Sequence, residues 1–175
     1  MHPEFAGDPL VRPARLAQLL DEAEGVDAVV GLGQRDSIVQ IIRRTLAACE
    51  PGVYSDRTFP VPTDDRVRLR IGPAHSAYLR ISEGCDHRCS FCTIPAIRGP
   101  FRSKPPELVL EEARELISSG AVELNLIGQD TTIYGRDLKM ADGLAHLLGE
   151  METIADLAWI RLLYAYPRGI TVSLI

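Results

Sequence analysis

The spacing of apolar residues predicts an alternation of helices and strands along the chain. Between residues 11 and 24 the apolar positions lie near one helical face, and Gly25 follows as a helix stop. The short run VDAVVG at 26–31 predicts a buried strand, and apolar residues from Ile38 to Ala48 predict a second helix. A helix, a strand and a helix in this order are typical of the tail of an α/β domain.

The next stretch interrupts this pattern. Pro51, Gly52, Pro60 and Pro62 precede a polar step at 63–65, a composition that breaks regular structure and predicts a linker. We therefore expect three parts: the end of an N-terminal domain at 1–50, a linker at 51–72 and a second domain at 73–175.

The second domain repeats strands and helices. Its pattern predicts strands at 76–82, 122–127 and 159–164, with helices at 105–119 and 142–154 between them. Strands that alternate with helices favour a parallel sheet, so the expected fold class is α/β.

The composition of the chain agrees with a globular protein. Of its 175 residues, 46% are apolar and 25% are charged. The net charge of -5 disfavours direct binding of nucleic acid. No apolar run reaches the roughly 18 to 20 residues that span a bilayer, and the start does not resemble a signal peptide, so we expect no membrane association and a cytoplasmic location.

Three of the four cysteines form the triplet CxxxCxxC at Cys85, Cys89 and Cys92. Such clustering does not suit a disulfide framework and indicates a metal site. Structural zinc usually takes four protein ligands, whereas three thiolates on an iron-sulfur cubane leave one iron open for a reactant. His87 or Cys49 would have to complete a closed zinc site, but His87 would strain the loop and Cys49 has no paired spacing.

The triplet follows the strand at 76–82, and Phe91 before the last cysteine completes CxxxCxFC. This pattern resembles the radical S-adenosylmethionine (SAM) superfamily. The resemblance implies a partial (β/α) barrel, here incomplete, in which Cys85, Cys89 and Cys92 hold a 4Fe-4S cluster whose open iron binds SAM. Reductive cleavage of SAM then gives a 5′-deoxyadenosyl radical. The resemblance places Phe91 beside the adenine, and packing in the core is the other interpretation of this residue.

The flanking residues AYLRISEGCDHRC at 77–89 and IPAIRG at 94–99 resemble the methylthiotransferases. LIGQDTT at 126–132 and RLLYAYP at 161–167 resemble the branch that attaches a methylthio group to the β-carbon of an aspartate in a small-subunit ribosomal protein. By position in the family, Gly128, Gln129 and Asp130 contact the methionyl amino group, although a polar turn at a strand end also explains them. Arg98 is a candidate partner for a carboxylate of the cofactor or substrate.

The resemblance also implies an electron donor such as flavodoxin or ferredoxin. Two alternatives remain open: the tRNA methylthiotransferase branch, which typically carries Gln-Asn-Val where this chain has Gln129, Asp130 and Thr131, and an iron-sulfur or zinc module without turnover. The family has a second 4Fe-4S cluster, and no cysteine here matches its three ligands. We expect a truncated piece of the family that cleaves SAM at best, and whose apolar strand at 159–164 leaves an edge prone to dimerisation or aggregation.

Overall fold

The computed structural model describes residues 13–48, 51–55, 59, 64–66 and 68–175. The chain divides into two compact units, whose described parts are residues 13–48, 51–55, 59 and 87–99 in the first and residues 64–66, 68–86 and 100–175 in the second.

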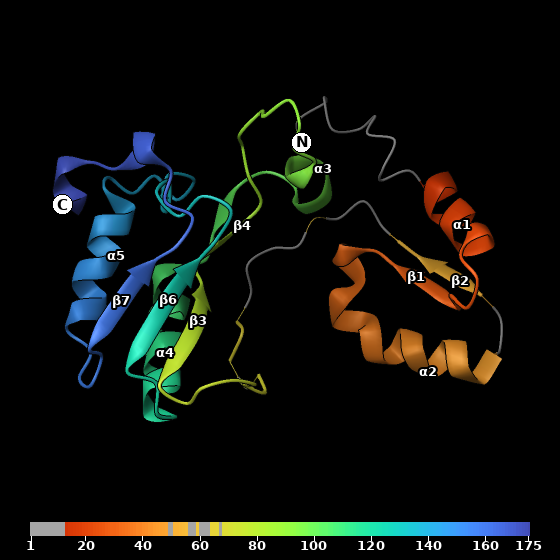
Figure 1. Ribbon diagram of the computed structural model, residues 1–175, viewed down its shortest axis with the longest axis horizontal. Helices are drawn as coiled ribbons and strands as arrows, with labels where there is room; N and C mark the ends of the chain where they lie inside the picture. Colours follow the sequence, from red (N-terminus) through yellow and green to blue (C-terminus); the bar gives the residue numbers. More distant parts are fainter. Residues whose placement is uncertain (1–12, 49–50, 56–58, 60–63, 67) are drawn as a thin grey trace. The chain divides into compact units, whose positions relative to one another are not determined.

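In the first unit, two short parallel strands lie with two helices (Figure 1). Helix α1 (Pro13–Glu22) precedes β1 (Ala28–Val30), a 3-10 helix follows at Leu32–Ser37, and α2 (Ile38–Ala48) leads to β2 (Gly52–Tyr54). The register of the strands pairs Val29 with Val53. The prediction of a linker from residue 51 is therefore wrong for residues 52–54, because Val53 and Tyr54 are strand formers that complete the sheet with β1.

The first unit also contains helix α3 (Ile94–Arg98), which the sequence pattern did not predict. Arg98 thus lies in a short helix and not in an irregular loop. A five-residue helix with a proline in its first turn is too short to show helical periodicity.

The second unit is built around the three-stranded parallel sheet β3-β6-β7. Its strands are β3 (Ser76–Arg80), β6 (Glu123–Ile127) and β7 (Trp159–Leu162), joined through helices α4 (Pro106–Ser118) and α5 (Gly143–Glu152). Two further 3-10 turns, Pro167–Gly169 and Val172–Leu174, follow β7. The strands and helices lie within the predicted ranges and all strand pairs of this sheet are parallel, which confirms the α/β class.

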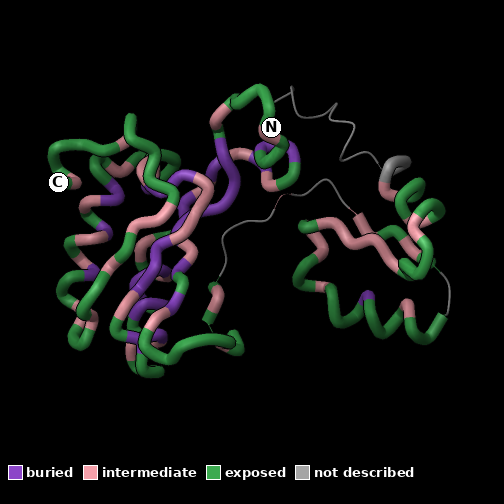
Figure 2. Tube along the Cα trace, viewed as in Figure 1, coloured by how far each residue is buried: buried purple, intermediate pink, exposed green. Residues whose placement is uncertain are grey.

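The core of the second unit lies between this sheet and its helices. Helices α4 and α5 contact one another, α4 contacts β3, and buried residues line the sheet in Figure 2. The apolar residues of the core that are not exposed at all are Leu79, Ile81, Val109, Ala113, Leu124, Leu126, Leu147 and Met151. No helix among the described residues is long and apolar enough to cross a membrane.

A small antiparallel ladder joins the segments on either side of the cysteine triplet. Strand β4 (Ser82–Glu83) pairs with β5 (Arg102–Ser103), and the backbone N–H of Lys104 donates to the carbonyl of Ile81 at 2.8 Å. The predicted strand at 76–82 is therefore divided, because its last residue leaves the parallel sheet to pair with β5. We call residues 82–86 and 101–104 the loop neck.

Candidate radical SAM site

The cysteine triplet follows directly on β4. Cys85 is buried, with 7% of its surface exposed, Cys92 is half-buried and Cys89 is exposed. Within the part of the chain that the structure describes, no three His, Cys, Asp or Glu side chains form a group that could hold a metal ion. Cys49, the alternative ligand, lies outside the described residues, and His87 is half-buried.

Phe91 is 89% exposed, so the interpretation that its ring packs in the core is wrong. Removal of an exposed aromatic ring changes the free energy of folding little, and such a ring is available to stack on a planar ligand. The adenine contact implied by the family resemblance stays a prediction for this residue.

Several hydrogen bonds hold the loop neck together. Asp86 accepts the backbone N–H of Phe101 at 3.0 Å and forms an ion pair with Arg136 at 2.9 Å. Asp137 accepts both the N–H and the hydroxyl of Ser103, at 2.9 and 2.6 Å. These contacts fix the chain immediately beside Cys85 and again at the far end of the cysteine segment.

The turn after β6 lies at the same edge of the sheet as the end of β3, because the two strands are parallel. Gly128 approaches β4 so closely that a Cβ atom there would lie 2.3 Å from Ser82 Oγ. The Oε1 atom of Gln129 and the Oγ atom of Ser82 are buried and have no hydrogen-bond partner among the described residues. A buried acceptor without a donor is costly unless a ligand supplies one.

Asp130 is 1% exposed, and its Oδ1 accepts the N–H and hydroxyl of Thr132 at 3.0 and 2.6 Å. Thr131 donates its hydroxyl to the carbonyl of Leu163 at 2.8 Å and its N–H to Tyr164, just beyond β7. Asp130 therefore holds the turn in shape, and contact between its carboxylate and the cofactor stays a prediction. The structure thus brings Gly128 together with Ser82, and ties the turn after β6 to the end of β7.

Five charged side chains form a chain of ion pairs that the sequence analysis did not anticipate as a site. We call Asp65, Arg80, Glu83, Lys104 and Glu112 the ion network. Burial alone would raise the pKa of Asp65, but hydrogen bonds from Lys104 and Arg80 outweigh it and lower that pKa below its ordinary value of 3.8. Burial would likewise lower the pKa of Arg80, yet its carboxylate partners raise it. The sequence feature that could have revealed the ion network is Glu112, a charged residue on the buried face of α4 beside Val109, Ala113 and Leu116.

Comparison with known proteins decides the family. The model of the radical SAM superfamily matches residues 79–171, more than half of the chain. The chain belongs to the radical SAM superfamily. This membership implies SAM and an iron-sulfur cluster as cofactors.

Curated relatives of this radical SAM chain carry the name ribosomal protein uS12 methylthiotransferase RimO. The relative from Geobacter sulfurreducens is 49% identical over 158 residues, covering 90% of this chain and 35% of the relative. Those from Solibacter usitatus and Geotalea uraniireducens are 45% and 44% identical, with 88% and 90% of this chain and 32% and 35% of the relatives covered. The chain thus spans about a third of the length of the curated relatives it matches.

Proposed function

We propose that Cys85, Cys89 and Cys92 bind a 4Fe-4S cluster and that the chain cleaves SAM reductively. The observation that carries this proposal is the CxxxCxxC triplet at the end of β4, within the region matched by the superfamily model. Three thiols with no fourth cysteine in the segment suit a cluster with one open iron better than a closed zinc site.

The residues at the strand ends fit the cofactor chemically. Gln129 Oε1 is a buried acceptor that would accept a hydrogen bond from a donor such as the methionyl ammonium of SAM. The absence of a side chain at Gly128 keeps the turn against Ser82, and Asp130 holds the shape of that turn. The exposed ring of Phe91 would stack on the adenine. When bound, the cluster supplies the electron for cleavage of SAM, and these residues orient SAM and exclude water.

For the substrate, we propose ribosomal protein uS12, the protein in the name of the relatives, with the methylthio group transferred to the β-carbon of an aspartate, as the family resemblance implies. Support comes from identities of 40–49% to proteins of that name and from Gln129-Asp130-Thr131, where the tRNA-modifying branch typically carries Gln-Asn-Val. The net charge of -5 also argues against an RNA substrate. We propose flavodoxin or ferredoxin as the electron donor and the cytoplasm as the location.

Anaerobic reconstitution with iron and sulfide tests the cofactor. We expect about four irons per chain, and loss of most of this iron when Cys85, Cys89 and Cys92 are all replaced by serine. The matched control is Cys49→Ser, which should bind as much iron as the unchanged chain. One tightly bound zinc per chain, or equal loss of iron in the control, would contradict the proposal and favour the binding-module alternative.

Product analysis separates the remaining alternatives. With dithionite and SAM, the reconstituted chain should release 5′-deoxyadenosine and methionine, and the triple serine variant should release neither. A binding module without turnover gives no 5′-deoxyadenosine from either chain. Methylthiolation of tRNA under conditions that leave a uS12 peptide unmodified would refute the proposed substrate.

A further inference from the structure

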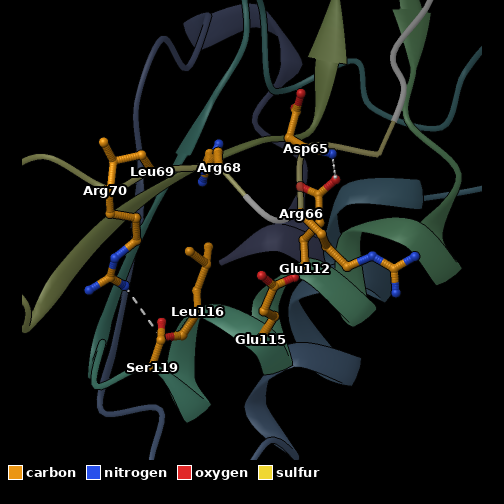
Figure 3. Close-up of a pocket in the computed structure, with 9 residues that line it drawn as sticks. All are labelled: Asp65, Arg66, Arg68, Leu69, Arg70, Glu112, Glu115, Leu116 and Ser119. Atoms are coloured by element: carbon orange, nitrogen blue, oxygen red, sulfur yellow. Dashed lines mark hydrogen bonds between the residues drawn. The ribbon is translucent and has the colours of Figure 1, made fainter.

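The ion network connects four segments of the second unit. Lys104 Nζ donates to Glu112 at 2.7 and 2.8 Å and to Asp65 at 2.9 Å. Arg80 donates through Nε and Nη2 to Asp65, at 3.0 and 2.9 Å, and through Nη1 to Glu83 at 2.7 Å. The backbone N–H of Asp65 also donates to Glu112 at 2.6 Å, a bond that Figure 3 shows between the segment at 65–70 and helix α4.

Most of this network is shielded from water. Lys104 is fully buried, the side chains of Glu83 and Glu112 are 1% and 3% exposed, and that of Arg80 is 14% exposed. A buried charge without its partner is costly, so each member is restricted to the geometry in which its partners reach it. Arg80 is the branch point, because its planar guanidinium binds Asp65 and Glu83 at the same time.

Glu83, at one end of the ion network, lies next to the cysteine segment in the chain. Glu83 belongs to β4, and only Gly84 separates it from Cys85. Gly84 has φ of 75°, a conformation that favours glycine, so the chain turns sharply between the anchored carboxylate and the thiol. The place of Cys85 therefore depends on where Glu83 is held.

We propose that Arg80 is a positioning residue for Cys85. Held by Asp65, and through Asp65 by Lys104 and Glu112, it fixes Glu83 and so keeps the Cys85 thiol in its buried place before any cofactor binds. The value of this position for cluster assembly rests on the proposed function, in which Cys85 is a cluster ligand. The position itself is a property of the chain without cofactor.

A surface pair provides the matched control. Arg161 donates to Glu123 at 2.8 Å on the same sheet, but the Arg161 side chain is 57% exposed. Glu123 lies at the start of β6, away from the carboxyl end of that strand. Arg161→Met removes an arginine–glutamate pair of similar length without touching the loop neck. It therefore measures the effect of losing such a pair in general.

The experiment compares the alkylation rates of Cys85 and Cys89 in the cofactor-free chain, using iodoacetamide under reducing conditions and peptide mass spectrometry. In the unchanged chain, buried Cys85 should react about tenfold or more slowly than exposed Cys89. Arg80→Met and Arg80→Lys should each raise the Cys85 rate about fivefold or more without changing the Cys89 rate, because an ammonium cannot replace the two-sided fork of arginine. Arg161→Met should leave both rates unchanged.

The conservative variant separates positioning from general stability. If circular dichroism shows that Arg80→Met is unfolded, the Cys85 alkylation rate of Arg80→Lys serves as the test. If both Arg80 variants are unfolded, the rate of Glu83→Gln serves instead. A folded variant in which Cys85 reacts at the rate of the unchanged chain overturns the inference. An accelerated Cys85 with no iron uptake by the unchanged chain upholds the inference and refutes the cluster, whereas normal iron uptake with an unaltered Cys85 rate refutes only the inference.

Discussion

Replacement of Lys104 by methionine should be among the most destabilising single changes in the second unit. Lys104 is fully buried and compensates Glu112, whose side chain is 3% exposed. Methionine preserves the volume of the side chain but leaves that carboxylate without its cation. Removing one partner of a buried ion pair costs about 3–5 kcal/mol. For a chain of this size, about 2–4 °C per kcal/mol converts this loss into a fall of roughly 6–20 °C in the unfolding midpoint.

Urea unfolding at pH 7, followed by far-ultraviolet circular dichroism, measures this loss as a free energy. The double variant Lys104→Met with Glu112→Gln removes both charges and keeps an acceptor for the backbone N–H of Asp65. It should recover about half of the loss or more, because the uncompensated carboxylate is gone. Lys139, which is exposed, provides the control: Lys139→Met should change stability by less than about 0.5 kcal/mol.

Two results would refute this reasoning. A loss below about 1 kcal/mol in Lys104→Met would show that the pair is solvated and the network open to water. A double variant as unstable as Lys104→Met alone would show that the two side chains are not coupled.

Three further outcomes are expected. Gly128→Ala places a Cβ 2.3 Å from Ser82 Oγ and should cost about 1–3 kcal/mol, whereas adding Ser82→Ala should recover most of it; thermal midpoints of both variants check this, and equal midpoints contradict the close approach. Phe91→Ala should leave the midpoint of the cofactor-free chain unchanged but weaken SAM binding to the reconstituted chain, measured by equilibrium dialysis. Despite the burial of Asp65, its two cationic partners hold its pKa below 3.8, so its stabilising effect is present above that pH and is lost as the pH falls through the folded-state pKa. Urea unfolding between pH 6 and 3 should show the free energy of unfolding falling with pH, and Asp65→Asn should make that fall smaller.

The sequence predicts the regular elements well where apolar periodicity is strong. Helix α2 occupies the predicted range from Ile38 to Ala48, although Ile41 is its buried residue, and β6 and β7 lie inside the predicted strands. The central residues of β6 are buried, whereas the residues of β7 are half-buried or exposed. Strand β2 was missed because Gly52 and the neighbouring prolines dominate the local pattern, while its pairing with β1 is a tertiary contact. The role of Glu112 depends on Lys104 and on the backbone N–H of Asp65, which contact it in space.

The candidate site divides in the same way. The cysteine triplet is recognisable from its spacing, since ligand chemistry fixes both residue type and interval. The environment of the triplet is not recognisable, because it depends on pairs far apart in sequence: Asp65 contacts Glu112 across 47 positions, and Gly128, just after β6, lies against Ser82, just after β3. Such contacts leave no local pattern.

The ladder between β4 and β5 has a consequence for protein engineering. The ladder joins the two ends of the 18-residue segment from Gly84 to Phe101, with Ser82 opposite Ser103 and Glu83 opposite Arg102. The register of the two strands therefore does not depend on the length of that segment. Because the entropy of closing a loop grows only with the logarithm of its length, doubling the segment would cost about 0.6 kcal/mol. The length of the chain between the two strands can therefore change at little cost, provided that Asp86 and Phe101 keep the hydrogen bond that holds the loop neck.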